Sequence, residues 1–544
     1  MVRAARIMIS ILLSTCPVYI IHNSYADDIQ TSAVDRSVSS STSAALRSVL
    51  ESMHSAGDTR FKQQFSALQS FYRDRNFEPA WTGSPDATKA AAKVLATMAD
   101  ADKLGLDSTQ YAFQTPDAHG TIAPGTDAAI YDVSLTDVLI RYSTDLHAGR
   151  VHPKAVYNDI ALPETNFNAL AAIESALQTH SIDAFLSSLA PAHPEYHRLA
   201  AALVRYRNIA ARGGWPTVSG ADRGKAALYS RLAMEDSSLP ATGRPTDAQL
   251  KDAIKRYQIR SGMTPDGTLR PEVISGLNVP VADRIQQILA NLERWRWMSS
   301  GFENRYVIIN VPDQTLEFVQ EGRGILASRV IVGRKASPTP ILRTVASSLV
   351  ANPPWDIPGD IAADQLLPHL KSDRNYLAAH NMIIVNAPGD PRGWNIPWGQ
   401  ISRRDFPYAI RQMPPNSALG ALMLDMPNEF DVYLHDTPGK RFFHDDDREI
   451  SNGCVRVEQI MALASLALTN DPSAGRAQLN SAISSHQTQR IMLDEPLPIY
   501  MLYWTAIADA DGNVGFRPDR YHRDPSLIEA LNKRAPSAST QTGE

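Results

Sequence analysis

The chain has 544 residues, of which 43% are hydrophobic, and a formal net charge of −5 at pH 7. This length provides for two to four domains with a sizeable core, so we expect a multidomain soluble protein. The mildly acidic balance, with no basic stripe to neutralise phosphates, argues against nucleic acid as a partner.

The first 26 residues predict a secretory signal peptide. Two arginines precede an apolar run over residues 7–21, and Ser24 and Ala26 give the small-x-small pattern that predicts cleavage after Ala26. The apolar run falls short of the roughly 20 residues that span a bilayer, so a cleaved signal is favoured over a membrane anchor. Lipid attachment at Cys16 is a minor alternative. The mature chain is then expected to have no transmembrane span, and loss of both arginines changes its charge to −7.

Helical patterns dominate the next part of the chain. Residues 45–210 predict an all-helical domain, because Ala-rich amphipathic stretches alternate there with short loops. A compact helical module over 238–280 follows. In it, Thr246 and Gln249 form a capping box before an amphipathic helix, and Pro271 starts a second short helix. A further amphipathic helix leads into the next domain.

From Tyr306 the hydrophobic period becomes that of β-strands. Three β-branched-rich runs within 306–332 open a β-rich domain, which we place at 304–508. A polar segment over 356–408 interrupts it, and an insertion of this size is either an ornament or a lid over a site. The tail over 534–544 has the composition of a disordered segment.

Loss of the signal peptide would leave Cys454 as the one cysteine, so no internal disulfide can form. In an oxidising compartment a lone thiol is either buried and inert or has a chemical role. His435 ends an apparent strand nineteen residues earlier, and Gly453 permits an unusual backbone beside the thiol. A helix with an apolar face at 460–467 places Cys454 just before a helix N-terminus. The helix dipole and the imidazole would there favour the nucleophilic thiolate.

Spacing alone leaves other interpretations open. His444 is closer to Cys454 and fits equally well as a base. His435, His444, Cys454 and the acidic run 445–447 could bind a metal, although their spacing matches no common zinc motif and short acidic runs are normally solvated loops. Residues 509–513 hint at a calcium loop but lack its downstream ligands, which favours a plain hairpin turn.

Residues 431–457 resemble the active-site signature of the L,D-transpeptidase family, in which a histidine precedes a Ser-x-Gly-Cys-x-Arg core. Residues 45–210 are similar to the helical scaffold domain of the larger periplasmic members, and 238–280 to a peptidoglycan-binding module. The resemblance implies a multidomain α+β protein whose β-rich catalytic domain carries an inserted lid. Further similar motifs are Asn352-Pro353-Pro354-Trp355 with Pro358, Arg411-Gln412 with 416–420, Met426-Pro427-Asn428, and Tyr503-Trp504-Thr505-Ala506.

The same resemblance implies roles for single residues. Cys454 is the nucleophile, and backbone N–H groups around Gly453 and Cys454 are the oxyanion donors. His435 is the general acid and base, and it is the sole matching base because Asn452 stands where many relatives have histidine. Arg456 either holds a substrate carboxylate or braces its loop. The expected substrate-binding residues are Arg456, Asn452, Ser451 and Trp355, although a loop serine such as Ser451 usually has a structural role.

The implied reaction forms 3-3 peptidoglycan cross-links in the periplasm. The thiolate attacks a tetrapeptide stem, releases D-alanine and leaves a thioester that a second stem resolves. No metal or organic cofactor is needed, accessory cell-wall proteins could take part, and carbapenem-type β-lactams would acylate Cys454. With water as acceptor the enzyme would be a carboxypeptidase or endopeptidase, and with a lipoprotein lysine it would attach that protein to the wall. An inactive cell-wall binding protein and a redox- or metal-sensing thiol protein are the alternatives from other classes.

Overall fold

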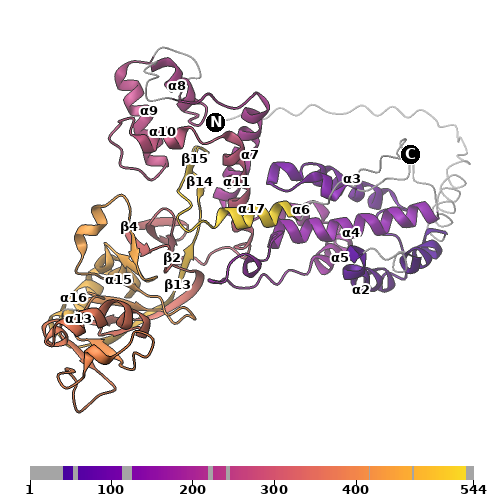
Figure 1. Ribbon diagram of the computed structural model, residues 1–544. Helices are drawn as coiled ribbons and strands as arrows, with labels where there is room; N and C mark the ends of the chain where they lie inside the picture. The colour runs from indigo at the N-terminus through magenta and orange to yellow at the C-terminus, as the bar shows by residue number, and fades with distance from the viewer. Residues whose placement is uncertain are drawn as a thin grey trace, which may run out of the picture. The chain divides into compact units, whose positions relative to one another are not determined.

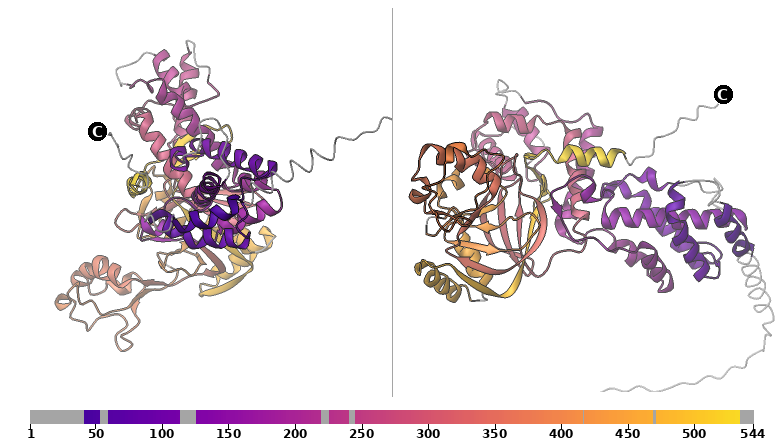
Figure 2. Two further views of the ribbon diagram at one scale, coloured as in Figure 1. Left: turned by 90° about the vertical axis from the view of Figure 1, so that its right-hand side faces the viewer. Right: turned by 60° about the horizontal axis from the view of Figure 1, so that its bottom comes forward.

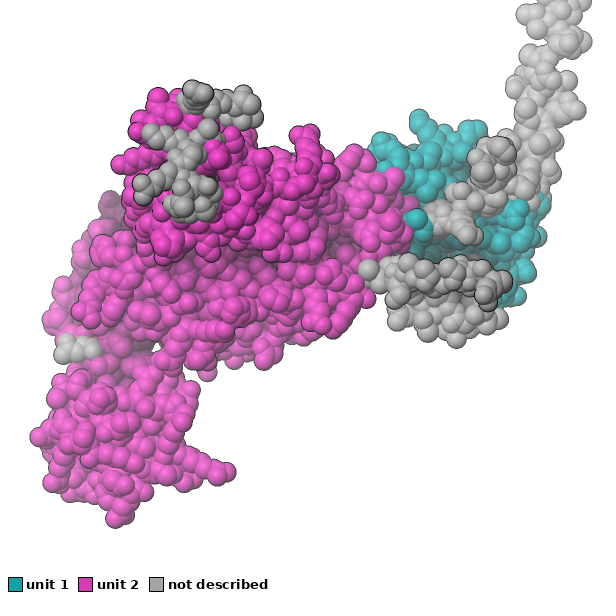
Figure 3. Space-filling view, turned by 45° about the horizontal axis from the view of Figure 1, so that its top comes forward, with its two compact units in different colours: residues 1–97, 111–141, 170–183 teal, residues 98–110, 142–169, 184–544 magenta. Residues whose placement is uncertain are grey.

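The computed structural model describes residues 41–52, 59–112, 125–218, 225–239, 245–415, 417–468 and 471–533. They form two compact units (Figure 3): residues 1–97, 111–141 and 170–183 belong to unit 1, and residues 98–110, 142–169 and 184–544 to unit 2. The expected signal peptide over 1–26 and the tail over 534–544 lie outside the described residues. Within the described ranges, no helix has both the length and the apolarity to cross a bilayer.

Unit 1 consists of helices. A buried carboxylate, that of Asp132, organises its core. It accepts hydrogen bonds from the Tyr72 hydroxyl at 2.9 Å and from the backbone N–H groups of Ala80 and Trp81 at 2.8 and 2.9 Å. These bonds offset the cost of burying the carboxylate, which raises the pKa of Asp132. The helices that contribute to the unit are α2 (Thr59–Asp74), α3 (Pro85–Ala99), α4 (Thr126–Ala148), α5 (Ala169–Gln178) and α6 (Ile182–Ser188) (Figure 1).

The region predicted as one helical domain, 45–210, is divided between the two units. Its last helix, α7 (Pro194–Ala211), belongs to unit 2 and packs on α11 (Val281–Arg296). The expectation of an all-helical region is wrong at one place, because the two-residue strand β1 (Ile160–Ala161) pairs with β5 (Ile341–Ala351). Two extended residues leave no periodicity in a sequence, and their pairing depends on the exposed edge of a distant strand.

The predicted helical module has three helices, of which the first was missed. The capping box is present: the Thr246 hydroxyl accepts from the Gln249 N–H at 3.2 Å, and the Gln249 side chain accepts from the Thr246 N–H at 2.9 Å. Buried residues of all three helices, among them Leu232, Tyr257 and Val273, form one hydrophobic core. The helices are α8 (Lys225–Ala233), α9 (Asp247–Arg260) and α10 (Pro271–Leu277).

A sheet that closes on itself forms the core of the β-rich region (Figure 2). Its order is β5-β13-β2-β3-β4-β12-β10-β9, and β9 pairs back onto β5. Inward side chains such as Val307, Phe318 and Met501 are fully buried. The strands, besides β5, are β2 (Arg305–Asn310), β3 (Thr315–Gln320), β4 (Arg323–Gly333), β9 (Leu422–Asp425), β10 (Leu434–His435), β12 (Val455–Val457) and β13 (Gln489–Leu502). The strand β11 (Glu449–Ser451) pairs with β4 at the side, and α15 (Ile460–Leu468) and α16 (Pro472–Ser484) follow β12.

The predicted insertion has a sheet and a core of its own. The strands β6 (Trp355–Ile357), β8 (Ile410–Gln412) and β7 (Met382–Ile384) form its sheet, and Leu366 and Trp398 lie in its core. It therefore spans slightly more than the predicted 356–408. Its helical turns are α12 (Gly359–Ile361), a π-helical turn at Ala362–Leu366, α13 (Leu367–Ser372), α14 (Tyr376–Ala379) and a 3-10 turn at Trp398–Gln400.

The chain continues in ordered elements past residue 508. The hairpin β14 (Ala506–Ala508) and β15 (Val514–Phe516) is closed by Asp509, whose carboxylate accepts from the N–H groups of Asp511 and Asn513. The segment 509–513 is therefore the plain turn that the sequence favoured. The helix α17 (Asp524–Lys533) follows and contacts α11.

Candidate active site

Two neighbouring parallel strands carry the candidate catalytic residues. Leu434 of β10 pairs with Val455 of β12, and His435 pairs with Arg456. Side chains alternate along a strand, so His435, Arg456 and Cys454 lie on one face of the sheet, while Leu434 and Val455 point into the core and are fully buried. No hydrogen bond joins His435 to Cys454 within the described chain, which is common for catalytic pairs before substrate binds.

The ring of His435 is fixed by a backbone carbonyl. Its Nδ1 lies 2.5 Å from the carbonyl oxygen of Asp436, and because a carbonyl only accepts, Nδ1 carries the hydrogen. In the neutral ring the lone pair is then on Nε2, the nitrogen that would accept a proton. Burial and repulsion from Arg456 lower the pKa of His435 to about 4. Hydrogen bonds to the backbone carbonyls of Asp436 and Leu419 oppose this shift, because they favour the protonated ring. The imidazole is therefore neutral at pH 7.

The thiol is neutral as well. Burial raises the pKa of Cys454, although the backbone N–H of Tyr433 and the charge of Arg456 both favour the thiolate. The predicted position before a helix N-terminus is wrong, because β12 follows Cys454 and α15 begins only at Ile460. Two buried valines flank Arg456 in a β-type alternation, and a helix dipole acts only within about one turn. The sequence therefore overestimated how far the thiolate is favoured at rest.

Ser451 and Gly453 shape the loop that presents the thiol. The Ser451 hydroxyl donates to the carbonyl of Cys454 at 2.6 Å and accepts the N–H of Gly453 at 3.2 Å, and the residue is 2% exposed. Ser451 thus braces the loop, and its expected contact with substrate stays a prediction. Gly453 has φ +112°, a conformation that favours glycine. Its N–H is bonded to Ser451 in this structure, so the oxyanion role expected for Gly453 stays a prediction that would require this bond to be exchanged.

The N–H of Cys454 remains as the candidate oxyanion donor. It makes no hydrogen bond among the described residues. Thr339 orients it, because the Thr339 hydroxyl donates to the carbonyl of Gly453 at 2.7 Å and accepts the N–H of Gly333 at 2.9 Å. The C=O and N–H of a trans peptide point in opposite directions, so holding the Gly453 carbonyl on one side turns the Cys454 N–H to the other.

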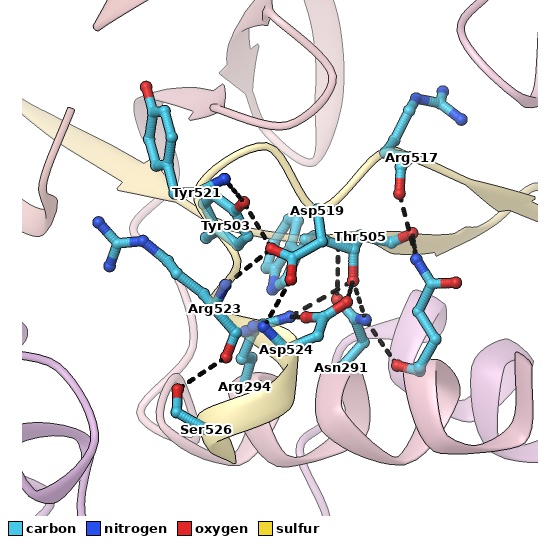
Figure 4. Close-up of polar contacts among 12 residues, drawn as sticks. Asn291, Arg294, Tyr503, Thr505, Arg517, Asp519, Tyr521, Arg523, Asp524 and Ser526 are labelled. Atoms are coloured by element: carbon cyan, nitrogen blue, oxygen red, sulfur yellow. Dashed lines mark hydrogen bonds and ion pairs between the residues drawn. The ribbon is translucent and has the colours of Figure 1, made fainter. Parts of the chain in front are cut away.

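Tyr521 supports this arrangement from the C-terminal part of the chain. Its hydroxyl donates to the carbonyl of Gly333 at 2.5 Å and accepts the N–H of Thr339 at 3.4 Å. The backbone of Tyr521 is held in turn, since its N–H donates to the Tyr503 hydroxyl, which donates to Asp519 at 2.7 Å (Figure 4). Sequence reasoning missed Thr339 and Tyr521, because both are distant in the chain from Cys454 and neither stands in a recognisable motif.

Arg456 carries a charge without a partner. Its Nε is buried and unbonded, and the side chain forms no hydrogen bond or ion pair with any described residue. Burial lowers the pKa of Arg456, and Cys454 opposes this. Of the two roles expected for it, bracing the loop has no hydrogen bond or ion pair to support it within the described structure. A guanidinium beside the thiol is suited to bind a carboxylate.

Comparison with known families identifies the β-rich region. Residues 304–473 match the family model described as the L,D-transpeptidase catalytic domain, and residues 66–203 match the model of a scaffold domain. The chain carries an L,D-transpeptidase catalytic domain. It is also 36% identical over 245 residues to a Haemophilus influenzae protein whose name gives it provisionally as an L,D-transpeptidase. That match covers 44% of this chain and 49% of the relative, so the chain spans about half the length of the curated relative.

Two solved structures are also similar to the chain. One is an L,D-transpeptidase from Stackebrandtia nassauensis, 14% identical, with a TM-score of 0.19, covering 52% of this chain and 91% of that one. The other is the Ldtfm-avibactam carbamoyl enzyme, 9% identical, with a TM-score of 0.19, covering 37% of this chain and 49% of that one. Likenesses at this level add nothing to the fold argued above.

The other predicted site residues differ in where they lie relative to Cys454 and His435. Trp355 packs on the core of the insertion and has no described contact with Cys454. Asn452 is half-buried beside the thiol, with its side chain unbonded among the described residues. His444 is exposed at the end of the 3-10 helix Lys440–His444, where its charge acts on Glu458, so it does not replace His435. In the part of the chain described, no three His, Cys, Asp or Glu side chains meet in a way that could hold a metal ion.

Proposed function

We propose that the protein is an exported cysteine-dependent L,D-transpeptidase that forms 3-3 cross-links between peptidoglycan stem peptides. One observation carries this proposal: Cys454, His435 and the unpaired Arg456 share one face of β10 and β12 inside the matched catalytic domain. A nucleophile, a neutral base and an anion-binding group are the three parts that acyl transfer from a peptide with a free carboxylate requires.

The first step transfers an acyl group to the enzyme. Nε2 of His435 takes the thiol proton as Sγ of Cys454 attacks the carbonyl that precedes the terminal D-alanine of a tetrapeptide stem. The N–H of Cys454 stabilises the oxyanion. The imidazolium then protonates the amine of the departing D-alanine, and a thioester remains. Since both partners are neutral at rest, the charged pair forms only as the bond to the carbonyl forms.

The second step resolves the thioester. The amine of an acceptor stem attacks, His435 accepts its proton, and the thiol is regenerated with the proton returned to Sγ. Arg456 binds a carboxylate of the donor stem, which is why its charge has no partner inside the protein. Water in place of the amine would make the enzyme a carboxypeptidase or endopeptidase, and a lipoprotein lysine would make it an attaching transferase.

We further propose that residues 1–26 direct export to the periplasm, that the module with α9 and α10 binds peptidoglycan, and that the insertion covers the bound substrate. Sequence pattern and resemblance support these three roles. A reporter that is active only outside the cytoplasm, fused after residue 60, tests export. Sedimentation with insoluble peptidoglycan, with and without residues 225–280, tests the module.

The decisive experiment is mass analysis of the mature chain incubated with disaccharide-tetrapeptide. The expected result is an acyl adduct on Cys454, loss of D-alanine and a cross-linked dimer, with all three absent in Cys454→Ala. His435→Gln is expected to lower the rate of adduct formation by about 10²- to 10⁴-fold, because it removes the base.

The other outcomes separate the alternatives. An adduct with tripeptide as the only product would point to hydrolysis, and dimer formation by Cys454→Ala would rule out the thioester. No adduct from either the stem or a carbapenem would leave a cell-wall binding protein. Reversible oxidation or bound metal at Cys454 as the functional event would favour a sensor.

A further inference from the structure

A cavity of about 200 Å³ lies away from the face that carries Cys454 and His435. It is bounded by the outer faces of β2 and β3, the start of α7, the end of α11 and the segment after β13. Tyr306, Ile308 and Glu317 face it, whereas their strand neighbours Val307 and Phe318 point into the core. In the order of the sheet, β4 separates these strands from β12 and β10, so the cavity is distinct from the Cys454 site.

Aromatic rings form the walls of this cavity. Trp295 stacks on Trp504 with ring centroids 4.1 Å apart, and His193 stacks on the same indole of Trp295 at 4.6 Å. Phe302 and Tyr306 stack at 4.8 Å. Burial, with Arg198, lowers the pKa of His193, so this ring is neutral at pH 7. The lining is therefore rich in aromatic rings that stack on one another, and it includes no lysine or arginine among the described residues.

The polar lining of the cavity is acidic. Oε1 of Glu195 is buried and has no hydrogen-bond partner in the described structure, and Glu317 lies at the rim. Neither carboxylate forms an ion pair with a described residue. Burial raises the pKa of Glu195 to about 7, against the charges of Arg198 and Arg517 and a hydrogen bond from the backbone N–H of Ala508. The nearest arginines are used elsewhere: Arg198 donates to the carbonyl of Ala508, and Arg517 pairs with Asp313. No lysine or arginine lines the cavity.

We propose that this cavity is a binding site for a small organic ammonium group. The charged form of Glu195 is costly out of water, because one of its oxygens has no hydrogen-bond partner in the described structure, and a bound cation would favour that charged form. Ring faces attract ammonium groups, and aromatic walls around a carboxylate are the arrangement that recognises quaternary ammonium ligands. An uncharged apolar ligand would leave Oε1 of Glu195 without a partner, and an anion would meet two acidic side chains.

The site joins two parts of the molecule. His193 and Glu195 lie within the region that matches the scaffold domain, whereas the strands belong to the catalytic domain. A bound ammonium group would therefore contact both, and small-molecule sites occur preferentially at such junctions. This inference does not rest on the proposed transpeptidase activity, and its failure would leave that activity untouched.

The test uses the full mature chain and two matched probes. Choline carries a quaternary ammonium, and 3,3-dimethylbutan-1-ol has the same shape with carbon in place of the charged nitrogen. Calorimetric titration and tryptophan fluorescence are expected to show saturable binding of choline and none of the alcohol at equal concentration. Propylammonium tests whether a primary amine also binds, and binding of either ammonium probe supports the proposal.

Variants locate the binding. Glu195→Gln keeps the shape of the side chain and is expected to weaken choline binding at least about tenfold, because a charge-assisted contact is lost. Glu317→Gln at the rim should weaken it less. Glu272→Gln, which removes the same charge from a residue of α10 outside the cavity, should have no effect.

Three results would overturn the proposal: equal binding of the alcohol and choline, no saturable response to either ammonium probe, or unchanged choline binding by Glu195→Gln with a wild-type circular dichroism spectrum. The probe comparison needs no variant, so the proposal can fail even if Glu195→Gln does not fold. Cys454→Ala serves as a further control, since its choline binding should equal that of the wild type.

Discussion

Two arginines of the same compact unit differ in what surrounds them. Arg296 of α11 is fully buried, pairs with Glu293 at 2.8 Å and donates to the carbonyl of Leu104. Burial disfavours its charge, but Tyr196 and Glu293 outweigh burial and raise its pKa above the ordinary value. Arg456 is half-buried on the catalytic face, and none of the described residues pairs with it.

The presence or absence of a partner inside the protein distinguishes an arginine with a structural role from one that is available to bind a ligand. A buried ion pair is tolerated only when both partners are present, because each alone pays the full desolvation cost. Arg456 bears part of that cost without a partner. Its charge also contributes to lowering the pKa of His435, and it opposes the rise that burial causes in the pKa of Cys454. Such uncompensated groups occur at functional sites more often than elsewhere.

The largest effect on stability is expected from breaking the paired arginine. Arg296→Met leaves Glu293 buried without its partner, so the free energy of unfolding should fall by about 3–5 kcal/mol. Urea unfolding followed by tryptophan fluorescence measures this. The double variant Arg296→Met/Glu293→Gln should recover part of the loss. If the single variant is as stable as the wild type, the contrast with Arg456 has no energetic basis.

The pH dependence of stability tests the charge on the catalytic face. The folded state binds the His435 proton only near pH 4, whereas an unfolded histidine binds it near pH 6.5. Stability is therefore present above pH 6.5 and is lost as the pH falls towards 4, by about 3 kcal/mol in total. The unfolding free energy of His435→Gln should lack this part of the loss. Equal pH dependence of the two proteins would contradict the lowered pKa.

The unpaired arginine should matter for substrate and little for folding. Arg456→Met is expected to lower kcat/KM for the tetrapeptide donor by about 10- to 100-fold through loss of a charge-assisted contact, mostly as a higher KM. Its unfolding free energy should stay equal or rise. Arg441→Met, at an exposed position in the 3-10 helix before His444, is the matched control and should leave both unchanged. A large loss of stability in Arg456→Met would instead make it structural.

The smallest effect is expected at the loop contacts. Thr339→Val and Tyr521→Phe each remove one hydroxyl that fixes the Gly453 carbonyl, directly or through Gly333, and each should lower kcat by about tenfold with little change in KM. Thr339→Ser keeps the hydroxyl and should retain activity. A rise in KM alone, or no rescue by serine, would exclude the orienting role proposed for Thr339.

Local patterns identified much of the fold. The capping box at Thr246 and Gln249, the strands after Tyr306 and the hairpin turn at 509–513 appear where the sequence predicted them, because each depends on neighbouring residues. The strand β1 and the strand after Cys454 were missed. Both depend on pairing with distant strands, which leaves no local signal.

The sequence by itself determined the family of the catalytic domain and made Cys454 and His435 its candidate catalytic residues, because the signature is a short run of residues whose chemistry is fixed by their types. Only the tertiary structure decided that the thiol and imidazole are neutral at rest, that Ser451 occupies the N–H of Gly453, and that Arg456 has no partner. Burial, hydrogen-bond partners and electrostatic neighbours are properties of the folded chain, and they arise from segments as distant as Thr339 and Tyr521.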